Sequence, residues 1–257
     1  MSKEKIKIIE GIDSYSPVID GVINVAKNYS YHLNKTEECV LIAPAAGKKD
    51  NYTDNESFKV IRCKSLSAPE KYRLALPSFD AKFRKAVLAE KPDVIHIQTP
   101  FTLAEFALKY GKKHKIPVVL TLHTKYKIDF ERALHGFKPL VWFMMKYIMR
   151  KFAKADSVWT VNDATAKVLR QYGFKGDIEV VHNGTDFVYP ENAAELIAKV
   201  DELHNLKGQK NVFLFVGRIA AYKNIWLLAD ALKILKDAGE DFRMIVVGSG
   251  FDEVKYK

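Results

Sequence analysis

The 257-residue sequence has little cysteine and lacks the motifs of the commonest hydrolytic, metal-dependent and phosphate-loop sites. Its two cysteines, Cys39 and Cys63, stand in apolar, strand-like surroundings without metal-ligand spacing. So few cysteines exclude a disulfide framework and indicate buried free thiols in a reducing compartment. A phosphate-loop lysine motif, a zinc-ligand cluster, a nucleophile elbow and a catalytic cysteine arrangement are all missing.

Long hydrophobic segments are also missing. The longest apolar run, Leu140–Met145, is far too short to cross a bilayer. The amino terminus, Met1–Gly11, alternates lysine and isoleucine and lacks the apolar stretch of a signal peptide. We therefore expect a cytoplasmic protein, either soluble or peripheral on the inner face of the cell membrane.

Basic residues exceed acidic ones, 41 against 31, which gives a formal net charge of +10. This excess favours anionic partners: phosphorylated small molecules, nucleic acid or anionic lipid headgroups. The charge alone does not choose among them. Because the basic residues are spread out and no nucleic-acid module signature is present, we do not expect a nucleic-acid partner.

Short β-branched runs alternate with helical patterns through the first two thirds of the chain. Several runs are apolar on both faces, which is typical of a parallel sheet covered by helices on both sides. The alternation predicts an α/β fold with a doubly wound, Rossmann-like parallel sheet. The predicted strands are Lys5–Glu10, Cys39–Ala43, Phe58–Cys63, Val94–Gln98, Val118–His123, Ser157–Val161 and Ile178–Val181.

The alternation stops near residue 188 and a second unit follows. We predict an amino-terminal domain over 1–188, a linker region over 189–210 and the start of a second Rossmann-like domain over 211–257. Two parallel strands with one crossover cannot cover their own apolar faces, so this second domain is expected to be incomplete within the sequence. Its predicted elements are strand Asn211–Val216, helix Lys223–Ala238 and strand Phe242–Val247.

The first candidate site segment, Ser16–Val22, directly follows the first predicted strand and contains Asp20 and Gly21. A glycine at the start of a helix lets the backbone approach a ligand, and the free N–H groups there attract anions. An ordinary β-to-α turn explains the same residues equally well.

A second candidate is His123, which with Thr124 stands at the carboxyl end of the strand beginning at Val118. Ligands of open parallel sheets bind beyond the carboxyl ends of the strands. The alternative is a histidine that caps the next helix. His96 lies in mid-strand and is expected to be a core residue.

A third candidate is the turn after the predicted strand that ends at Val216. It holds Gly217, which permits close approach, and two cations five residues apart, Arg218 and Lys223. Such a pair can neutralise a diphosphate leaving group, arginine as a bidentate fork and lysine as a point charge. Two solvated surface charges are the alternative.

A glycine turn, Gly248-Ser249-Gly250, follows the last predicted strand. A dinucleotide fingerprint would need a third glycine near position 253, where Glu253 stands, so binding of NAD is not expected. The sequence still allows these glycines to form a tight turn beside a nucleotide.

Taken in order, these segments resemble the family-4 retaining glycosyltransferases of GT-B fold, from residue 5 to the end of the sequence. Each stretch by itself is a weak signal of the family, but the six stretches in this order make the resemblance specific. The stretches that carry it are Tyr15–Val22, Tyr72–Pro77, Pro92–His96, His123-Thr124, His182–Asp186 and Val216–Arg218 with Lys223-Asn224.

The resemblance implies an enzyme that moves a sugar from a nucleotide diphosphate sugar to an acceptor, with retention and without a metal or other cofactor. Arg218 and Lys223, with Gly217, would bind the donor diphosphate, and His123 would lie beside the transferred sugar. The other implied cleft residues are Asp20, Gly21, Tyr72, Arg73 and Thr124, with Gly248 and Gly250 on the nucleotide side.

The sequence departs from the family pattern in two places. Many members carry a Gly-Gly pair in the first loop, whereas Asp20 precedes Gly21 here, so this loop is expected to favour an acceptor over a phosphate. The family's donor motif of two glutamates separated by seven residues would fall after Lys257, so this chain by itself is expected to be inactive or nearly so. Two alternatives remain: another GT-B enzyme such as a nucleotide-sugar epimerase, or a non-catalytic sugar-nucleotide or membrane-binding module.

The segment Phe137–Asp156 is apolar nearly all round but carries a basic stripe of Lys146, Arg150 and Lys154. Such a helix suits a headgroup interface, with a lipid acceptor at an anionic membrane surface as partner. The alternative is a helix buried against the sheet whose basic side chains reach solvent. A second candidate for contact with an anionic membrane is a basic helix near Lys71, Arg73, Lys82, Arg84 and Lys85. The sequence does not predict the oligomeric state.

Overall fold

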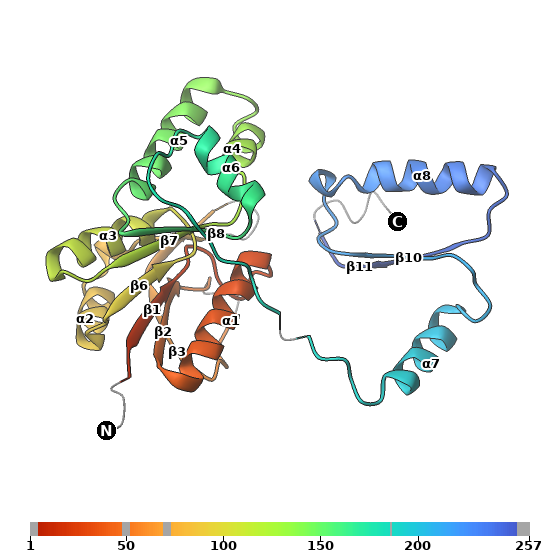
Figure 1. Cartoon of the computed structure of the whole chain (residues 1–257), viewed down its shortest axis with the longest axis horizontal. Coiled ribbons are helices and arrows are strands. Elements are labelled where there is room, and N and C mark those ends of the chain that lie inside the picture. The colour runs from red at the N-terminus through yellow and green to blue at the C-terminus, as the bar shows by residue number, and fades with distance from the viewer. Residues whose placement is uncertain (1–4, 48–51, 69–72, 186, 251–257) are drawn as a thin grey trace. The chain divides into compact units, whose positions relative to one another are not determined.

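The computed structural model describes residues 5–47, 52–68, 73–185 and 187–250 (Figure 1). The chain divides into two compact units, Met1–Thr185 and Asp186–Lys257, which we call the amino unit and the carboxyl unit. Tyr72, one of the predicted cleft residues, lies outside the described residues.

A seven-stranded parallel sheet forms the centre of the amino unit (Figure 1). The strand order is β3-β2-β1-β6-β7-β8-β9, and each neighbouring pair is parallel. The predicted α/β class and parallel sheet are thus confirmed. The strands are β1 Lys7–Gly11, β2 Glu38–Pro44, β3 Lys59–Cys63, β6 Val94–Ile97, β7 Val118–Leu122, β8 Ser157–Thr160 and β9 Glu179–Val180.

Six α-helices lie among the described residues of the amino unit. Asp80 caps one of them by accepting a hydrogen bond from the Phe83 amide at 3.1 Å, and Asn162 caps another through Thr165 at 2.8 Å. The helices are α1 Gly21–Thr36, α2 Ala81–Glu90, α3 Thr102–His114, α4 Tyr126–Ala133, α5 Lys138–Phe152 and α6 Asp163–Gln171.

Two apolar clusters cover the two faces of the sheet. On one face, Ile23 and Ala26 of α1 pack with Leu41 of β2. A larger cluster joins Ile9 and Leu120 of the sheet to buried side chains of α2, α3 and α5. Because strand side chains alternate between faces, β2 contributes to both clusters.

A short antiparallel hairpin, β4 Ser65–Ser67 with β5 Arg73–Ala75, adds to the amino unit and was not expected from the sequence. The predicted basic helix that included Arg73 is therefore wrong at that position. Arg73 instead binds across the hairpin, with Nε 3.1 Å from Ser65 Oγ and Nη1 2.8 Å from Ser67 Oγ.

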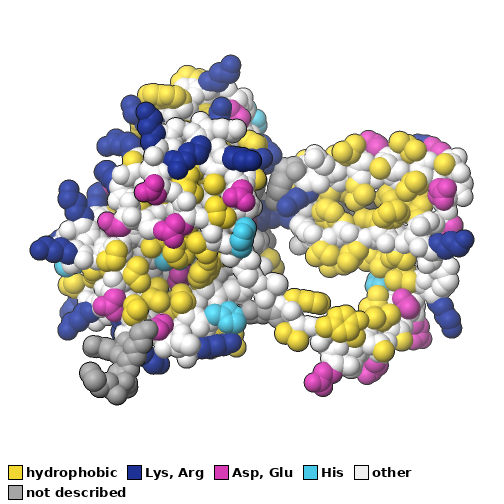
Figure 2. All heavy atoms as spheres, viewed as in Figure 1, with side chains coloured by type: hydrophobic (Ala, Val, Ile, Leu, Met, Phe, Trp, Pro, Cys, Tyr) yellow, Lys and Arg dark blue, Asp and Glu magenta, His cyan; other side chains and the backbone are white. Residues whose placement is uncertain are grey.

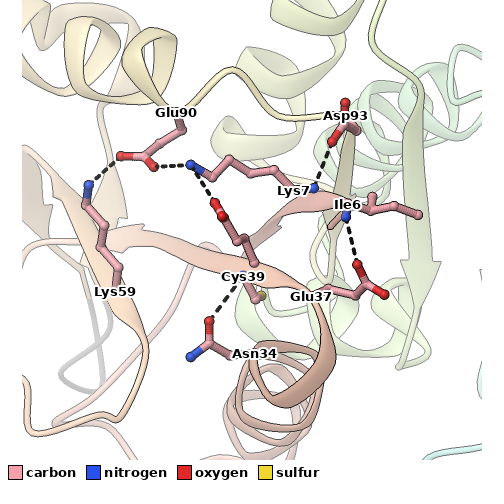
Figure 3. A network of polar contacts seen from close by, with 9 residues as sticks. Ile6, Lys7, Asn34, Glu37, Cys39, Lys59, Glu90 and Asp93 are labelled. Atoms are coloured by element: carbon pink, nitrogen blue, oxygen red, sulfur yellow. Dashed lines mark hydrogen bonds and ion pairs between the residues drawn. The ribbon is translucent and has the colours of Figure 1, made fainter. Parts of the chain in front are cut away.

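Polar contacts anchor the amino ends of the first strands (Figure 3). Lys7 Nζ lies 3.0 Å from a Glu38 oxygen and 3.4 Å from a Glu90 oxygen, and Glu90 also binds Lys59. The Lys7 amide donates to Asp93 at 2.8 Å, so a backbone group at the start of β1 is satisfied. These bonds join β1, β2, β3 and α2 at the edge opposite the one where the strands end.

Helix α5 is buried along one face only. Val141, Ile148 and Phe152 are buried, whereas Trp142 and Phe143 are 63% and 62% exposed. The alternative that this helix is buried against the sheet therefore holds for its inner face, and its outer face is exposed. Among the described residues, no helix is both long and apolar enough to cross a membrane.

A parallel strand pair and two α-helices make up most of the described carboxyl unit (Figure 1). Leu214 and Val216 of its first strand are 63% and 69% exposed, as expected for a two-stranded sheet with uncovered apolar faces (Figure 2). The elements are α7 Ala193–His204, β10 Val212–Val216, the 3-10 turn η4 Ala221–Lys223, α8 Ile225–Asp237 and β11 Arg243–Val247.

Candidate functional site

Three neighbouring strands, β1, β6 and β7, end at the same edge of the amino unit's sheet. The chain leaves β1 toward β2 on one side, while β6 pairs with β1 on the other side. Ligands of open α/β sheets bind at such a reversal of strand order. The structure thus places the loops that carry Asp20 and His123 at this edge, and the charge of Asp20 acts on the His123 ring.

The loop after β1 is fastened by a buried carboxylate. Asp13 accepts hydrogen bonds from Thr99 Oγ1 at 2.9 Å and from the Leu103 amide at 2.8 Å, and its own amide donates to Thr99. Burial raises the pKa of Asp13, and its bonds to α3 and to Thr99 oppose that shift. The loops after β1 and β6 are therefore held together at the start of α3.

The first candidate glycine lies where the sequence predicted it, at the first position of α1. Asp20 is the N-cap, and its Oδ1 accepts a hydrogen bond from the Val22 amide at 2.9 Å. A Cβ added at Gly21 would meet no described atom within 4 Å. Packing within the described residues therefore does not require a glycine here.

His123 follows β7 and is partly buried. Its Nε2 lies 2.6 Å from Gln98 Oε1. Burial is the largest cause that lowers its pKa, to about 4; the nearby His96 adds to this effect and Asp20 opposes it. The ring is therefore neutral at neutral pH. Because the N-cap of α4 is Lys125, the alternative that His123 caps the next helix is wrong.

Two buried residues behind His123 were missed by the sequence reasoning. Glu10 accepts from Gln98 Nε2 at 2.9 Å, and its other oxygen lies 2.8 Å from His96 Nδ1. Both Glu10 and Gln98 are fully buried, and His96 is a core residue as predicted. A glutamate within an apolar strand was the available signal, since a carboxylate is rarely buried without partners.

The remaining predicted cleft residues of the amino unit have local partners. Thr124 donates to Asp129 Oδ2 at 3.1 Å, near the start of α4. Arg73 is engaged in its hairpin. Their contact with a ligand stays a prediction.

In the carboxyl unit, the turns after β10 and β11 lie side by side. The Gly217 amide donates to Val247 O at 3.0 Å, and the Ile219 amide donates to Ser249 O at 2.9 Å. Arg218 stands within this paired turn, and the exposed Lys223 ends η4, just before α8. Both predicted cations thus lie on the segment that joins the carboxyl end of β10 to the next helix.

Gly248 and Gly250 are required by close backbone packing. A Cβ at Gly248 would lie 1.8 Å from Gly217 O, and one at Gly250 would lie 1.9 Å from Ile219 O. Gly248 also has a φ of +154°, which L side chains rarely adopt. These glycines therefore shape the turn that carries Arg218, and their predicted nearness to a nucleotide remains a prediction.

Comparison with known proteins decides the family. Residues 19–188 match Glycosyltransferase Family 4, and residues 197–257 match Glycosyl transferases group 1. The chain belongs to glycosyltransferase family 4. The first of these matches covers most of the amino unit of the family-4 chain, including its Asp20, Gly21 and His123.

Curated relatives of this family-4 chain are about one quarter identical to it. An alpha-monoglucosyldiacylglycerol synthase of Acholeplasma laidlawii is 25% identical, over 94% of this chain and 63% of its own length. The synthase of the same name from Streptococcus pneumoniae is 25% identical, over 93% and 54%. A GDP-mannose-dependent alpha-mannosyltransferase of Corynebacterium glutamicum is 24% identical, over 95% and 57%. The chain thus spans between half and two thirds of these relatives' length.

Solved structures support the fold of the family-4 chain. HepE of Anabaena, in complex with UDP and glucose, matches with a TM-score of 0.62 at 19% identity, over 96% of this chain and 64% of that one. Sucrose-phosphate synthase of Thermosynechococcus elongatus matches with a TM-score of 0.69 at 16% identity, over 96% and 63%. At these identities, the similarity supports the GT-B type of fold alone.

The lowered pKa of His123 predicts a contribution to acid sensitivity. The unfolded chain takes up a proton on this ring below pH 6.5, whereas the folded chain does so only near pH 4. Stability is therefore lost as the pH falls from 6.5 to 4, by at most about 3 kcal/mol. Urea unfolding at several pH values should show a smaller acid-induced loss in His123→Asn than in the wild type. The exposed His32→Asn serves as control, and parallel losses in all three proteins would contradict the assignment.

Alanine substitutions at Gly248 and at Gly217 should affect the stability of the carboxyl unit differently. Gly248→Ala must displace the Gly217 carbonyl and should destabilise this unit by at least about 2 kcal/mol. Gly217→Ala should be tolerated, because its added Cβ would lie 3.4 Å from the Phe215 ring, an ordinary contact. Hydrogen exchange of the β10 and β11 amides measures both. Equal protection in the two variants would show that the paired turn is not closely packed.

Proposed function

We propose that the protein to which this chain belongs transfers a hexose from a nucleoside diphosphate sugar to an acceptor, with retention and without a metal. The observation that carries the proposal is the corner of Gly217, Arg218 and Lys223 after β10, in a chain of a glycosyltransferase family. The comparison proteins support the donor class, since one relative is GDP-mannose-dependent and one similar structure is in complex with UDP and glucose.

The corner suits the departure of a nucleoside diphosphate. As the bond between the sugar and the diphosphate breaks, negative charge develops on the leaving oxygen. A guanidinium and an ammonium placed there stabilise this charge without a metal ion. The amide groups at the start of α8, which follows Lys223 after one residue, add to the positive potential.

Retention is proposed from the products that the relatives' names state. These names describe an alpha-glucosyl lipid synthase and an alpha-mannosyltransferase. Common nucleoside diphosphate hexoses such as UDP-glucose and GDP-mannose are themselves alpha-linked, so an alpha product keeps the configuration of the donor. We place His123 beside the transferred sugar and Asp20 and Gly21 at the acceptor.

Neutralising the two cations tests the donor site. Arg218→Gln and Lys223→Gln should each weaken binding of UDP and GDP, and lower kcat/KM of the whole protein, about 10-fold or more, because each removes a charge-assisted contact. Calorimetry and transfer assays in EDTA measure these effects. The control Lys236→Gln changes the same charge at the far end of α8 and should behave as the wild type. Unchanged turnover in the double variant, or a strict requirement for Mg²⁺ or Mn²⁺, would contradict the proposal.

A lipid acceptor is proposed from the relatives and from α5. Two relatives are named as synthases of a glucosyl diacylglycerol. The outer face of α5 exposes Trp142 and Phe143, and Lys146 Nζ lies 4.8 Å from the centroid of the Trp142 ring. Exposed aromatic side chains beside basic ones suit the headgroup region of an anionic membrane. We therefore propose peripheral association with the inner face of the cell membrane.

The double substitution Trp142→Ser with Phe143→Ser should lower partitioning into phosphatidylglycerol vesicles at least 10-fold, because two aromatic side chains no longer enter the interface. Co-sedimentation at low and high salt measures the bound fraction. Tyr189→Ser, an exposed aromatic of the carboxyl unit, is the control. Normal binding by the double variant together with loss of binding after neutralising Lys82, Arg84 and Lys85 would assign the membrane contact to α2 instead.

A further inference from the structure

A chain of buried polar side chains runs across the sheet behind the candidate site. His123 Nε2 lies 2.6 Å from Gln98 Oε1, and Gln98 Nε2 lies 2.9 Å from Glu10 Oε2. The other oxygen of Glu10 lies 2.8 Å from His96 Nδ1, and His96 Nε2 lies 2.7 Å from Thr121 Oγ1. Three strands, β1, β6 and β7, or the residues directly after them, contribute to this chain.

The register of the strands explains why these side chains meet. Glu10 pairs with His96 between β1 and β6. Gln98 follows His96 by two residues, and His123 follows Thr121 by two residues, so each pair lies on one face of the sheet. This face carries the polar chain between β1 and β7, whereas the opposite face holds the larger apolar cluster.

The chemistry of the groups allows one direction for these bonds. Gln98 Nε2 donates to Glu10 Oε2, so the amide oxygen of Gln98 is left for His123. That oxygen only accepts, so His123 Nε2 must carry the proton. In the neutral ring, Nδ1 then has no proton and is a hydrogen-bond acceptor.

We propose that Gln98, oriented by Glu10, is a positioning residue that holds His123 as an acceptor for a hydroxyl group of the transferred sugar. The ligand in this inference rests on the proposed function, whereas the protonation pattern of His123 rests on the contacts alone. Within the described residues, Gln98 is the hydrogen-bond partner of the His123 ring, so Nδ1 is left to a ligand. A histidine in this state orients the sugar and does not act as an acid.

The burial of Glu10 supports a positioning role. This carboxylate is fully buried, and its partners are an amide and an imidazole. Burying a carboxylate is costly unless hydrogen bonds replace its water. A valine or isoleucine would fill a strand of this sheet at lower cost, and neither would fix which way the Gln98 amide points.

Nitrogen-15 NMR of the imidazole rings tests the protonation pattern in the chain as it stands. The wild type should show His123 with a proton on Nε2 at neutral pH. Gln98→Met removes the acceptor and should give a mixture of both tautomers. A proton on Nδ1 in the wild type, or an unchanged pattern in Gln98→Met, overturns the inference.

Two further variants separate positioning from a general loss of structure. Glu10→Gln lets the Gln98 amide turn over and should also give mixed tautomers at His123. Thr121→Val removes the far end of the polar chain, where Thr121 Oγ1 meets His96 Nε2, and should leave His123 unchanged. If Gln98→Met does not fold, Glu10→Gln still decides the question: an unchanged tautomer in Glu10→Gln overturns the inference.

Turnover of the whole protein separates this inference from the proposed function. Gln98→Met should lower kcat about 10-fold with little change in the donor KM, because the diphosphate contacts are untouched. An unchanged kcat overturns the positioning role even where the Arg218 and Lys223 variants lose donor binding. Unchanged donor binding and turnover in those two variants overturn the proposed function instead.

Discussion

Parallel hydrogen bonding of β1 to β6, and of β6 to β7, is the constraint on which the candidate site of the amino unit depends. It makes three strands end at one edge of the sheet and brings their following loops together. The same register sets Glu10 beside His96 and carries the polar chain to His123. A slip of one residue in either pair would turn these side chains to the opposite face.

The two units carry different kinds of polar group. At the edge of the amino unit stand a neutral histidine and the carboxylate of Asp20, which suit the hydroxyl groups of sugars. The corner of the carboxyl unit holds Arg218 and Lys223, which suit phosphate groups. The glycines of the two units also differ. Gly21 has open space around its Cα, whereas Gly248 and Gly250 allow two backbone segments to come into contact.

Helix α5 shows how one apolar sequence serves two environments. Its buried face includes Lys151, whose ammonium lies 3.4 Å from Glu105, and whose pKa burial lowers to about 8. Its outer face exposes Trp142 and Phe143. A pattern that is apolar all round does not distinguish these faces, because periodicity records hydrophobicity and not the identity of the neighbour.

The sequence by itself determined the alternation of strands and helices, the parallel sheet, and the places of Gly21, His123 and Arg218 beside strand ends. These features follow from local periodicity and from the rule that ligands meet the carboxyl ends of parallel strands. Only the tertiary structure decided that Glu10 and Gln98 stand behind His123, that Arg73 belongs to a hairpin, and that Gly248 touches Gly217. These contacts join residues that are far apart in the chain. They arise from strand pairing and side-chain packing, which local periodicity does not reveal.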